Sequence, residues 1–306
     1  MKGASRYFLD RWVGAVFLAP SLALLTLVAI GPFVYAVALG FTDLNYAMPG
    51  RGGNFVGLDN YRRLLDDGVV WGSALTTLKF VAAAVTLEFV IGFAVALLFY
   101  SHLMNRRFAL TLMLIPMMLA PVAVGLLWKL MLQGDYGMAA HYLRSLGVVD
   151  DQTALLGDPD LALITIVLID VWQWTPFVTL VMLAGLLSLP REPFEAAIMD
   201  GAGRLRIFLD VTVPLLRPII GLVLLLRGID AFKEFDKVFI LTGGGPGTAT
   251  ELLSIYIYRV AFREWNLGYA AVCAFMVYLV VWLLCTLVHA LMTRQPGSKA
   301  IRGTSG

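Results

Sequence analysis

Charged, amide and aromatic side chains interrupt long apolar stretches of the chain. Carboxylate, guanidinium and amide groups supply hydrogen-bond donors and acceptors, and aromatic rings supply apolar faces. Such mixtures bind hydroxyl-rich solutes, whereas series of carboxylates relay protons across membranes. The side chains concerned are Asp170, Gln173, Trp174 and Phe177 in one stretch, Arg227, Asp230 and Glu234 in the next, and Lys129 in an earlier one.

Helical spacing places most of these residues on two faces. The sets are Asp170, Trp174 and Phe177, spaced i, i+4 and i+7, and Arg227, Asp230 and Glu234, spaced i, i+3 and i+7. We predict that both faces line a solute path within the membrane. In the alternative interpretation, Arg227 and Asp230 pair only to hold the helices together. Lys233, Asp236 and Lys237 would then extend toward the outer membrane surface.

The histidines and cysteines show no pattern of a metal or catalytic site. His102, His141 and His289 are scattered over different loops or helix ends. Cys273 and Cys285 would lie about 18 Å apart on one helix, which is too far for a disulfide. We therefore predict no catalytic residue and no metal site in this chain.

The composition is that of a membrane protein. Of 306 residues, 59% are hydrophobic and 14% are charged, and the mean hydropathy is +0.82. Soluble domains average about 45–50% apolar and about 25% charged residues, so a soluble chain of this size could not bury so much apolar surface. The net charge of +2 is too small for a nucleic-acid-binding surface, and we expect no nucleic-acid partner.

Six apolar stretches are long enough to cross a lipid bilayer as helices, which takes about 20 residues. No alternating strand pattern occurs, and only helices or closed barrels span lipid. The first stretch is too long for the apolar part of a signal peptide, so we expect an uncleaved span. The sequence thus predicts an all-α integral membrane protein, a bundle of six transmembrane helices in one domain over 1–306. The predicted spans are 13–40, 75–99, 108–132, 161–187, 214–240 and 268–292.

Lysine and arginine are unevenly distributed between the two sides of the predicted spans. Both tails, loop 100–107, loop 188–213 and Arg217 together hold twelve basic residues. The opposite, longer loops hold six. Because basic residues favour the cytoplasmic side, we predict that both termini and loop 188–213 are cytoplasmic.

Loop 188–213 carries the signals of a short helix. Pro193 suits a first helical turn, where its missing N–H is not needed. Glu195 places negative charge near the positive end of the helix dipole. Gly201 and Gly203 can end the helix in a left-handed cap. Such a helix can dock in a groove of another protein, and the alternative is a solvated hairpin between two spans.

The same loop contains Glu195-Ala196-Ala197, Asp200-Gly201 and Pro214 at defined distances. This pattern resembles the EAA loop of ABC-importer permeases, the segment by which the membrane subunit is gripped by its ATPase. The combination of segments is similar to the maltose-type permeases of carbohydrate uptake, without the extra N-terminal helices and large outer domain of the best-known maltose subunit. The segments that extend the resemblance are Phe55–Tyr61, Gly125–Trp128 and Phe235–Gly247.

The resemblance implies a membrane-spanning subunit of an ATP-driven importer for a sugar or sugar derivative, in the bacterial cytoplasmic membrane. It implies three kinds of partner: a second homologous permease, two ATPase subunits and an extracytoplasmic solute-binding protein. It places the solute between the fourth and fifth spans, where the two polar faces lie, and their partner helices. It also implies that the helix of loop 188–213 couples ATPase closure to alternating access. The coupling residues would be Glu195, Ala196, Ala197, Asp200, Gly201 and Pro214.

The sequence shows no ATP-binding motif. Gly243–Thr248 is glycine-rich, but no Gly-Lys-Ser or Gly-Lys-Thr follows it. We therefore expect no enzymatic activity and no cofactor in this chain, with ATP and magnesium bound by the partner ATPase.

Two other functions are open on the sequence alone. A proton-coupled secondary transporter could use Asp170, Asp230 and Glu234 as a relay, although no internal repeat is evident. A membrane-embedded enzyme would need an activated nucleophile or a metal, and the sequence offers neither. The solute is open among a neutral sugar, an anionic sugar derivative and a polyol, and Arg227 favours tolerance of an anionic group.

Overall fold

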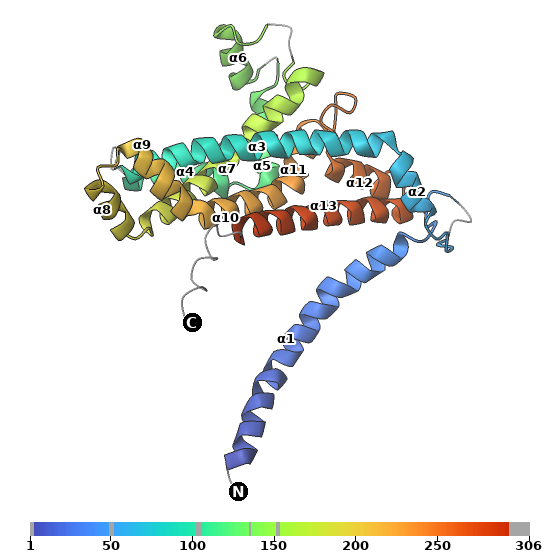
Figure 1. Cartoon of the computed structure of the whole chain (residues 1–306). Helices are drawn as coiled ribbons and strands as arrows, with labels where there is room; N and C mark the ends of the chain where they lie inside the picture. Colours follow the sequence, from blue (N-terminus) through green and yellow to red (C-terminus); the bar gives the residue numbers. More distant parts are fainter. Residues whose placement is uncertain (1–2, 49–51, 102–105, 135, 151–153, 294–306) are drawn as a thin grey trace. The chain divides into compact units, whose positions relative to one another are not determined.

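The computed structural model describes residues 3–48, 52–101, 106–134, 136–150 and 154–293 (Figure 1). Within these ranges the regular structure is helical, apart from two isolated β-bridges. Of the residues considered above, His102 and five of the basic residues counted for the orientation, Lys2, Arg51, Arg294, Lys299 and Arg302, lie outside the described ranges. The helices are α1 Gly3–Leu39, α2 Asp59–Asp66, α3 Gly68–Tyr100, α4 Arg106–Met118, α5 Pro121–Met131, α6 Met138–Ser145, α7 Pro159–Leu187, α8 Glu192–Met199, α9 Arg204–Ile207, a π-helical turn Phe208–Thr212, α10 Val213–Phe232, α11 Asp236–Leu241, α12 Leu253–Phe262 and α13 Leu267–Thr293.

The predicted membrane spans are present as helices. Among the described residues, five helical segments are long and apolar enough to cross a membrane, and one bent helix pair makes a sixth candidate. The prediction of an all-α membrane protein is confirmed. The five segments are Phe17–Leu39, Gly68–Tyr100, Pro159–Leu187, Arg204–Leu241 and Leu267–Val288, and the bent pair is Phe108–Met118 with Pro121–Met131.

The third apolar stretch differs from the straight span expected over 108–132. It consists of α4 and α5, whose axes are bent by 93°. Pro121 starts α5, and its ring disfavours helical backbone at the residue before it. Ala120 is accordingly extended, with φ −61° and ψ 138°. The bend thus follows from one proline at the first turn of the second helix.

The fifth stretch is interrupted near its C-terminal end. α10 ends at Phe232 and α11 begins at Asp236. Within the break, the Ser254 hydroxyl donates a hydrogen bond to the backbone carbonyl of Glu234. A side chain from outside the helix therefore replaces part of the bonding that an unbroken helix would supply.

Two compact units make up the chain, and the predicted single domain stays a prediction. In the first unit, the rings of Phe33 and Tyr278 lie 5.1 Å apart. The Asn60 amide donates to the carbonyls of Gly40 and Thr42 and so holds α2 at the end of α1. The units are 1–67 with 257–278, and 68–256 with 279–306.

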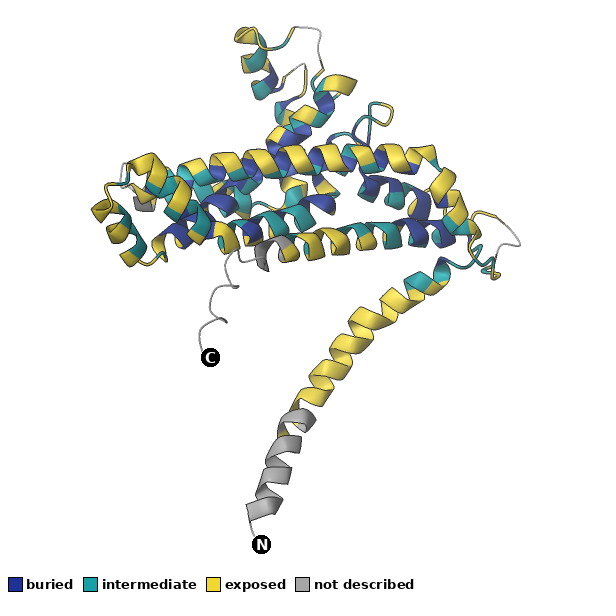
Figure 2. Ribbon diagram, viewed as in Figure 1, coloured by how far each residue is buried: buried dark blue, intermediate teal, exposed yellow. Residues whose placement is uncertain are grey.

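The first transmembrane helix has an uncovered surface. α1 exposes the side chains from Phe17 to Tyr35 on all sides (Figure 2). Most of them are apolar, as a helix that spans a membrane requires.

The second unit is built on the close pair α3 and α7. One apolar cluster surrounds Phe80 and Ile166, and another surrounds Met182 and Leu216. A glycine permits the helices to approach: a Cβ at Gly92 of α3 would come within 2.8 Å of the Val178 side chain on α7. This contact sets how closely the two helices pack.

We expect Gly92→Ala to lower the free energy of unfolding by about 1–3 kcal/mol, because overpacking forces α3 and α7 apart. Gly72→Ala is the matched control in the same helix, where a Cβ would meet no atom within 4 Å. It should be neutral or stabilise by up to about 1 kcal/mol through helix propensity. Thermal unfolding in detergent measures both, and equal unfolding temperatures would contradict the described packing of α3 on α7.

Candidate functional site

A buried arginine joins three of the long helices. Arg227 of α10 donates from Nε and Nη2 to the two carboxylate oxygens of Glu88 on α3, at 2.6 and 2.8 Å. Nη2 also donates to Asp170 Oδ2 on α7 at 3.0 Å, and Nη1 donates to Asp230 Oδ2 at 2.7 Å. The guanidinium therefore directs each of its nitrogen atoms to a carboxylate, the arrangement in which arginine binds most strongly.

A buried lysine extends this network beyond the break in the fifth stretch. Lys237 of α11 forms an ion pair with Asp170 and donates to Gln173 Oε1 at 3.0 Å. Its Nζ lies 3.1 Å from Glu234 Oε2. The side chain is fully buried, so the alternative in which Lys237 extends toward the membrane surface is wrong.

The helices hold this network between the two apolar clusters of the second unit. Along α7, Asp170 and Gln173 follow Ile166 of one cluster and precede Met182 of the other. Along α3, Glu88 likewise falls between members of the two clusters. Removing an ion from water costs several kcal/mol, and only close pairing offsets that cost. The network thus fixes the register of the helices as well as their contact.

Aromatic rings border the network on one side. The Arg227 guanidinium carbon lies 4.6 Å from the ring centre of Trp174. The rings of Trp174 and Phe177 meet edge to face at 6.3 Å. Trp174 Nε1 is buried without a hydrogen-bond partner among the described residues. Asp230 is 47% exposed at its side chain. Asp230, Trp174 and Phe177 therefore form the accessible edge of a site whose remaining members are buried.

Two predicted pathway residues lie apart from this edge. Glu234 is paired with Lys237, whereas Asp230 is paired with Arg227. The two carboxylates predicted to share one face therefore bind two different cations. Lys129 of α5 is exposed and donates to the backbone carbonyl of Ile240 at 2.7 Å. This hydrogen bond joins α5 to α11 and does not involve a carboxylate of the network. The pathway roles of these residues stay predictions.

Two members of the network, Glu88 and Lys237, were absent from the predicted site. Both were visible in the sequence as charges within apolar stretches, and an unpaired charge there is costly. That signal indicates that a partner exists, but spacing within one helix cannot identify a partner on another. Among the described residues, no group of three His, Cys, Asp or Glu side chains is arranged to hold a metal ion.

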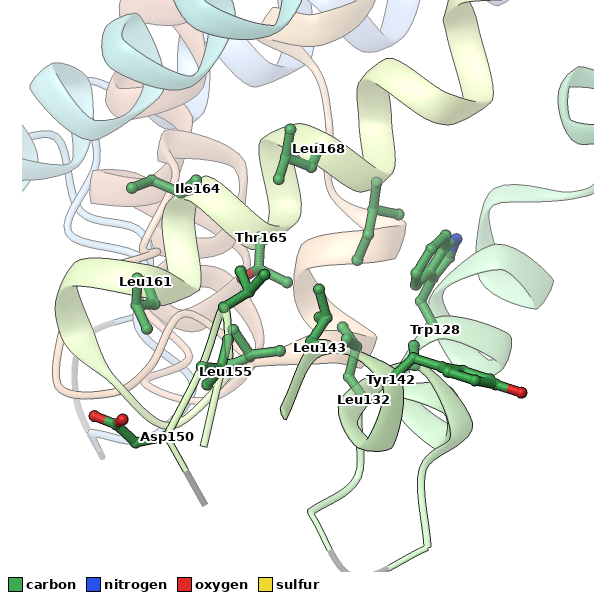
Figure 3. A pocket seen from close by; sticks show the side chains of 14 residues that line it. Trp128, Leu132, Tyr142, Leu143, Asp150, Leu155, Leu161, Ile164, Thr165 and Leu168 are labelled. Atoms are coloured by element: carbon green, nitrogen blue, oxygen red, sulfur yellow. The ribbon is translucent and has the colours of Figure 1, made fainter. Parts of the chain in front are cut away.

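An apolar pocket is present whose lining includes no member of the network (Figure 3). It has a volume of about 670 Å³ and is lined by side chains of α5, α6, α7 and the segment before α7. Trp128, Leu143, Leu155 and Leu168 belong to its walls, which are mostly aliphatic. None of the predicted pathway residues lines it, and its apolar walls offer few groups for a hydroxyl-rich solute.

The predicted helix of loop 188–213 is present as α8, and its end is well defined. Gly201 has φ +75°, and the next N–H, that of Ala202, bonds to the carbonyl of Ala197. The Gly201 N–H bonds to Ile198, which completes a Schellman cap. Gly203 has φ −71° and precedes α9, so only Gly201 has the predicted left-handed conformation.

We expect Arg227→Met to destabilise the protein by about 3–5 kcal/mol, because it leaves Glu88 buried without its cation. Combining it with Glu88→Gln should recover part of that loss, giving a coupling free energy of about 1–3 kcal/mol in a double-mutant cycle. Lys233→Met is the control: it removes an exposed cation near the same break and should change stability by less than about 0.5 kcal/mol. Unfolding midpoints in detergent provide the measurement, and additive effects of the two network substitutions would contradict the pairing.

Comparisons with known proteins identify the family. A family model described as "Binding-protein-dependent transport system inner membrane component" matches residues 88–296. A probable ABC transporter permease protein of Sinorhizobium fredii is 38% identical over 252 residues, which cover 82% of this chain and 81% of the relative. The trehalose/maltose transport system permease protein MalF of Thermococcus litoralis is 40% identical over 214 residues, which cover 70% of each chain.

The fold is also known. It is shared with a chain in the crystal structure of a bacterial ABC transporter involved in the import of the acidic polysaccharide alginate. The TM-score is 0.80 at 19% identity, covering 96% of this chain and 99% of that chain. The chain belongs to the binding-protein-dependent transport system inner membrane components, the membrane-spanning permease subunits of ABC importers, in which a partner ATPase hydrolyses ATP.

Proposed function

We propose that this chain forms half of the membrane path of an importer for a sugar or sugar derivative, delivered by an extracytoplasmic binding protein. The observation that carries the proposal is the family match over residues 88–296, together with a trehalose/maltose permease as a relative at 40% identity. The edge formed by Asp230, Trp174 and Phe177 is chemically suited to such a solute. Carboxylates accept hydrogen bonds from hydroxyl groups, and aromatic faces pack on the C–H surfaces of a sugar ring.

The other half of the path would come from a second homologous permease. In this chain, the Asp230 side chain is half exposed. A second membrane chain against it would complete the path and cover the carboxylate, which lipid does not accept.

Two ATPase subunits, binding ATP and magnesium, would drive the cycle from the cytoplasmic side through α8. Exposed on and beside this helix are the carboxylates of Glu195 and Asp200 and the apolar side chains of Ile198 and Met199, which are 63% and 86% exposed. Exposed apolar side chains beside charges are typical of a docking surface. The small side chains of Ala196 and Ala197 would let the helix backbone approach the walls of a groove closely.

Loop 188–213 could also transmit movement of the ATPase to α10. The Gly201 cap holds the end of α8, and Pro214 lies in the first turn of α10. α8, α9 and the π-helical turn Phe208–Thr212 pack on one another. ATPase closure would pull on α8 and tilt α10, which carries Arg227 and Asp230. The solute path would thereby open alternately to the two sides of the membrane. This placement requires loop 188–213 and both termini to be cytoplasmic.

The proton-relay alternative is disfavoured by the contacts of its residues. A relay carboxylate has to exchange protons with water along the path. Asp170 is fully buried between Arg227 and Lys237, and Glu234 is paired with Lys237. Of the three candidate carboxylates, Asp230 is the one with substantial exposure.

We expect Glu195→Lys to abolish co-purification of the ATPase, or at least to lower solute-stimulated ATP hydrolysis by about tenfold or more. The reason is that it reverses a charge in the middle of the proposed contact. Asp160→Lys makes the same charge change on an exposed residue of α7 outside the loop and should leave the complex intact. Pull-down with the tagged permease and a phosphate-release assay in lipid vesicles measure both. An unaffected complex with full stimulation would refute the proposed role of α8.

Gly201→Ala should weaken coupling more than Gly203→Ala does. An alanine Cβ is strained at φ +75° but accommodated at φ −71°, and at neither position does it meet an atom within 4 Å. The strain is about 1 kcal/mol, enough to displace the end of α8. Solute-stimulated ATP hydrolysis compares the two variants, and equal activities would indicate that the cap is not needed for coupling.

A further inference from the structure

Neither cation of the ionic network is available to a solute. Arg227 is 2% exposed and directs every nitrogen atom to a carboxylate. Lys237 is fully buried and bound to Asp170, Gln173 and Glu234. The expectation that Arg227 would favour an anionic group therefore has no basis in the folded protein.

Asp230 is the network member at the protein surface. Its side chain is 47% exposed, and Arg227 Nη1 holds its Oδ2 at 2.7 Å. Asp230 continues a stripe of α10 in which Leu222 and Leu226 are 47% and 44% exposed, four residues apart. Because a carboxylate within a span avoids lipid, this end of the stripe borders water or another protein chain.

The surroundings of Asp230 match a neutral, hydroxyl-rich molecule. The Arg227 guanidinium that holds this carboxylate also lies over the Trp174 ring, at 4.6 Å from its centre. The Trp174 and Phe177 rings are partly exposed. An accepting carboxylate and aromatic faces can each bind part of a sugar, and neither of them neutralises an anion.

We propose that Asp230 is a specificity-determining residue, which gives this part of the solute path a negative potential. Neutral hydroxyl-rich solutes are then accepted, and anionic ones are disfavoured. Arg227 holds the carboxylate in place without contacting the solute itself. The inference rests on the proposed function, because it takes the exposed stripe of α10 to border the solute path.

A single introduced thiol can measure this potential. Leu226→Cys, in a background with Cys273→Ala and Cys285→Ala, places the thiol one helical turn from Asp230. The full transporter, assembled with its partner subunits in lipid nanodiscs, is treated with a cationic and an anionic methanethiosulfonate reagent. We expect the cationic reagent to react faster, and Asp230→Asn to lower the ratio of the two rate constants about fourfold at low ionic strength.

Two further variants make the result specific. Asp230→Glu keeps the charge and should keep the ratio, whereas Asp230→Asn keeps an oxygen that can accept from Arg227 and so preserves the fold. Lys233→Gln removes the exposed cation three residues away, which forms no ion pair with Asp230 in the described part of the chain. It should change the ratio by less than about twofold.

Three results would overturn the inference: an unreactive thiol at position 226, faster reaction of the anionic reagent, or a ratio that Asp230→Asn does not change. ATP-dependent solute uptake is measured in parallel on the wild-type transporter. Uptake that requires ATP, together with an unchanged ratio, would reject the role of Asp230 and keep the proposed function. Absence of ATP-dependent uptake would reject the proposed function itself.

Discussion

The pairing of one buried guanidinium with three carboxylates constrains the larger helical unit more than any apolar contact does. Arg227 binds Glu88 of α3, Asp170 of α7 and Asp230 of its own helix. Apolar helices can slide on one another with a small loss of free energy, but a buried ion that loses its partner costs several kcal/mol. The relative positions of α3, α7 and α10 are therefore set by charge, and the two apolar clusters pack around that arrangement.

Asp170 extends the constraint across the interrupted fifth stretch. One of its oxygens binds Arg227 before the break, and the other binds Lys237 after it. A single residue of α7 thus holds both α10 and α11. The break itself is bridged by Ser254, which donates to Glu234. The interruption is consequently a fixed feature of the fold, and it allows Lys237 to turn into the interior.

Much of the architecture could be predicted because it depends on local sequence. Apolar length identified the spans, and the residues from Glu195 to Pro214 identified the family through one loop. The bend before Pro121 also had a local signal, in the missing N–H and the restricted residue before it. The interruption between Phe232 and Asp236 had none, since no glycine or proline marks it.

The composition of the site was harder to predict. Glu88 and Lys237 complete the network, but which helices neighbour each other depends on tertiary packing and is not encoded in helical spacing. Spacing correctly grouped Arg227 with Asp230, which the structure pairs. It could not separate the buried residues from the accessible edge, because burial is decided by α3 and α7 together. Lys129 illustrates the same limit, since its partner is a backbone carbonyl on α11.

The most direct test of the account is solute uptake into lipid vesicles that contain this chain with its partner permease and ATPase. The vesicles are assayed with the binding protein outside, with and without ATP in the lumen, and with and without an imposed proton gradient. The account predicts that uptake of the sugar requires ATP and the binding protein and does not respond to the proton gradient. Uptake that is driven by the proton gradient in the absence of ATP would contradict it and return Asp170, Asp230 and Glu234 to consideration as a proton path.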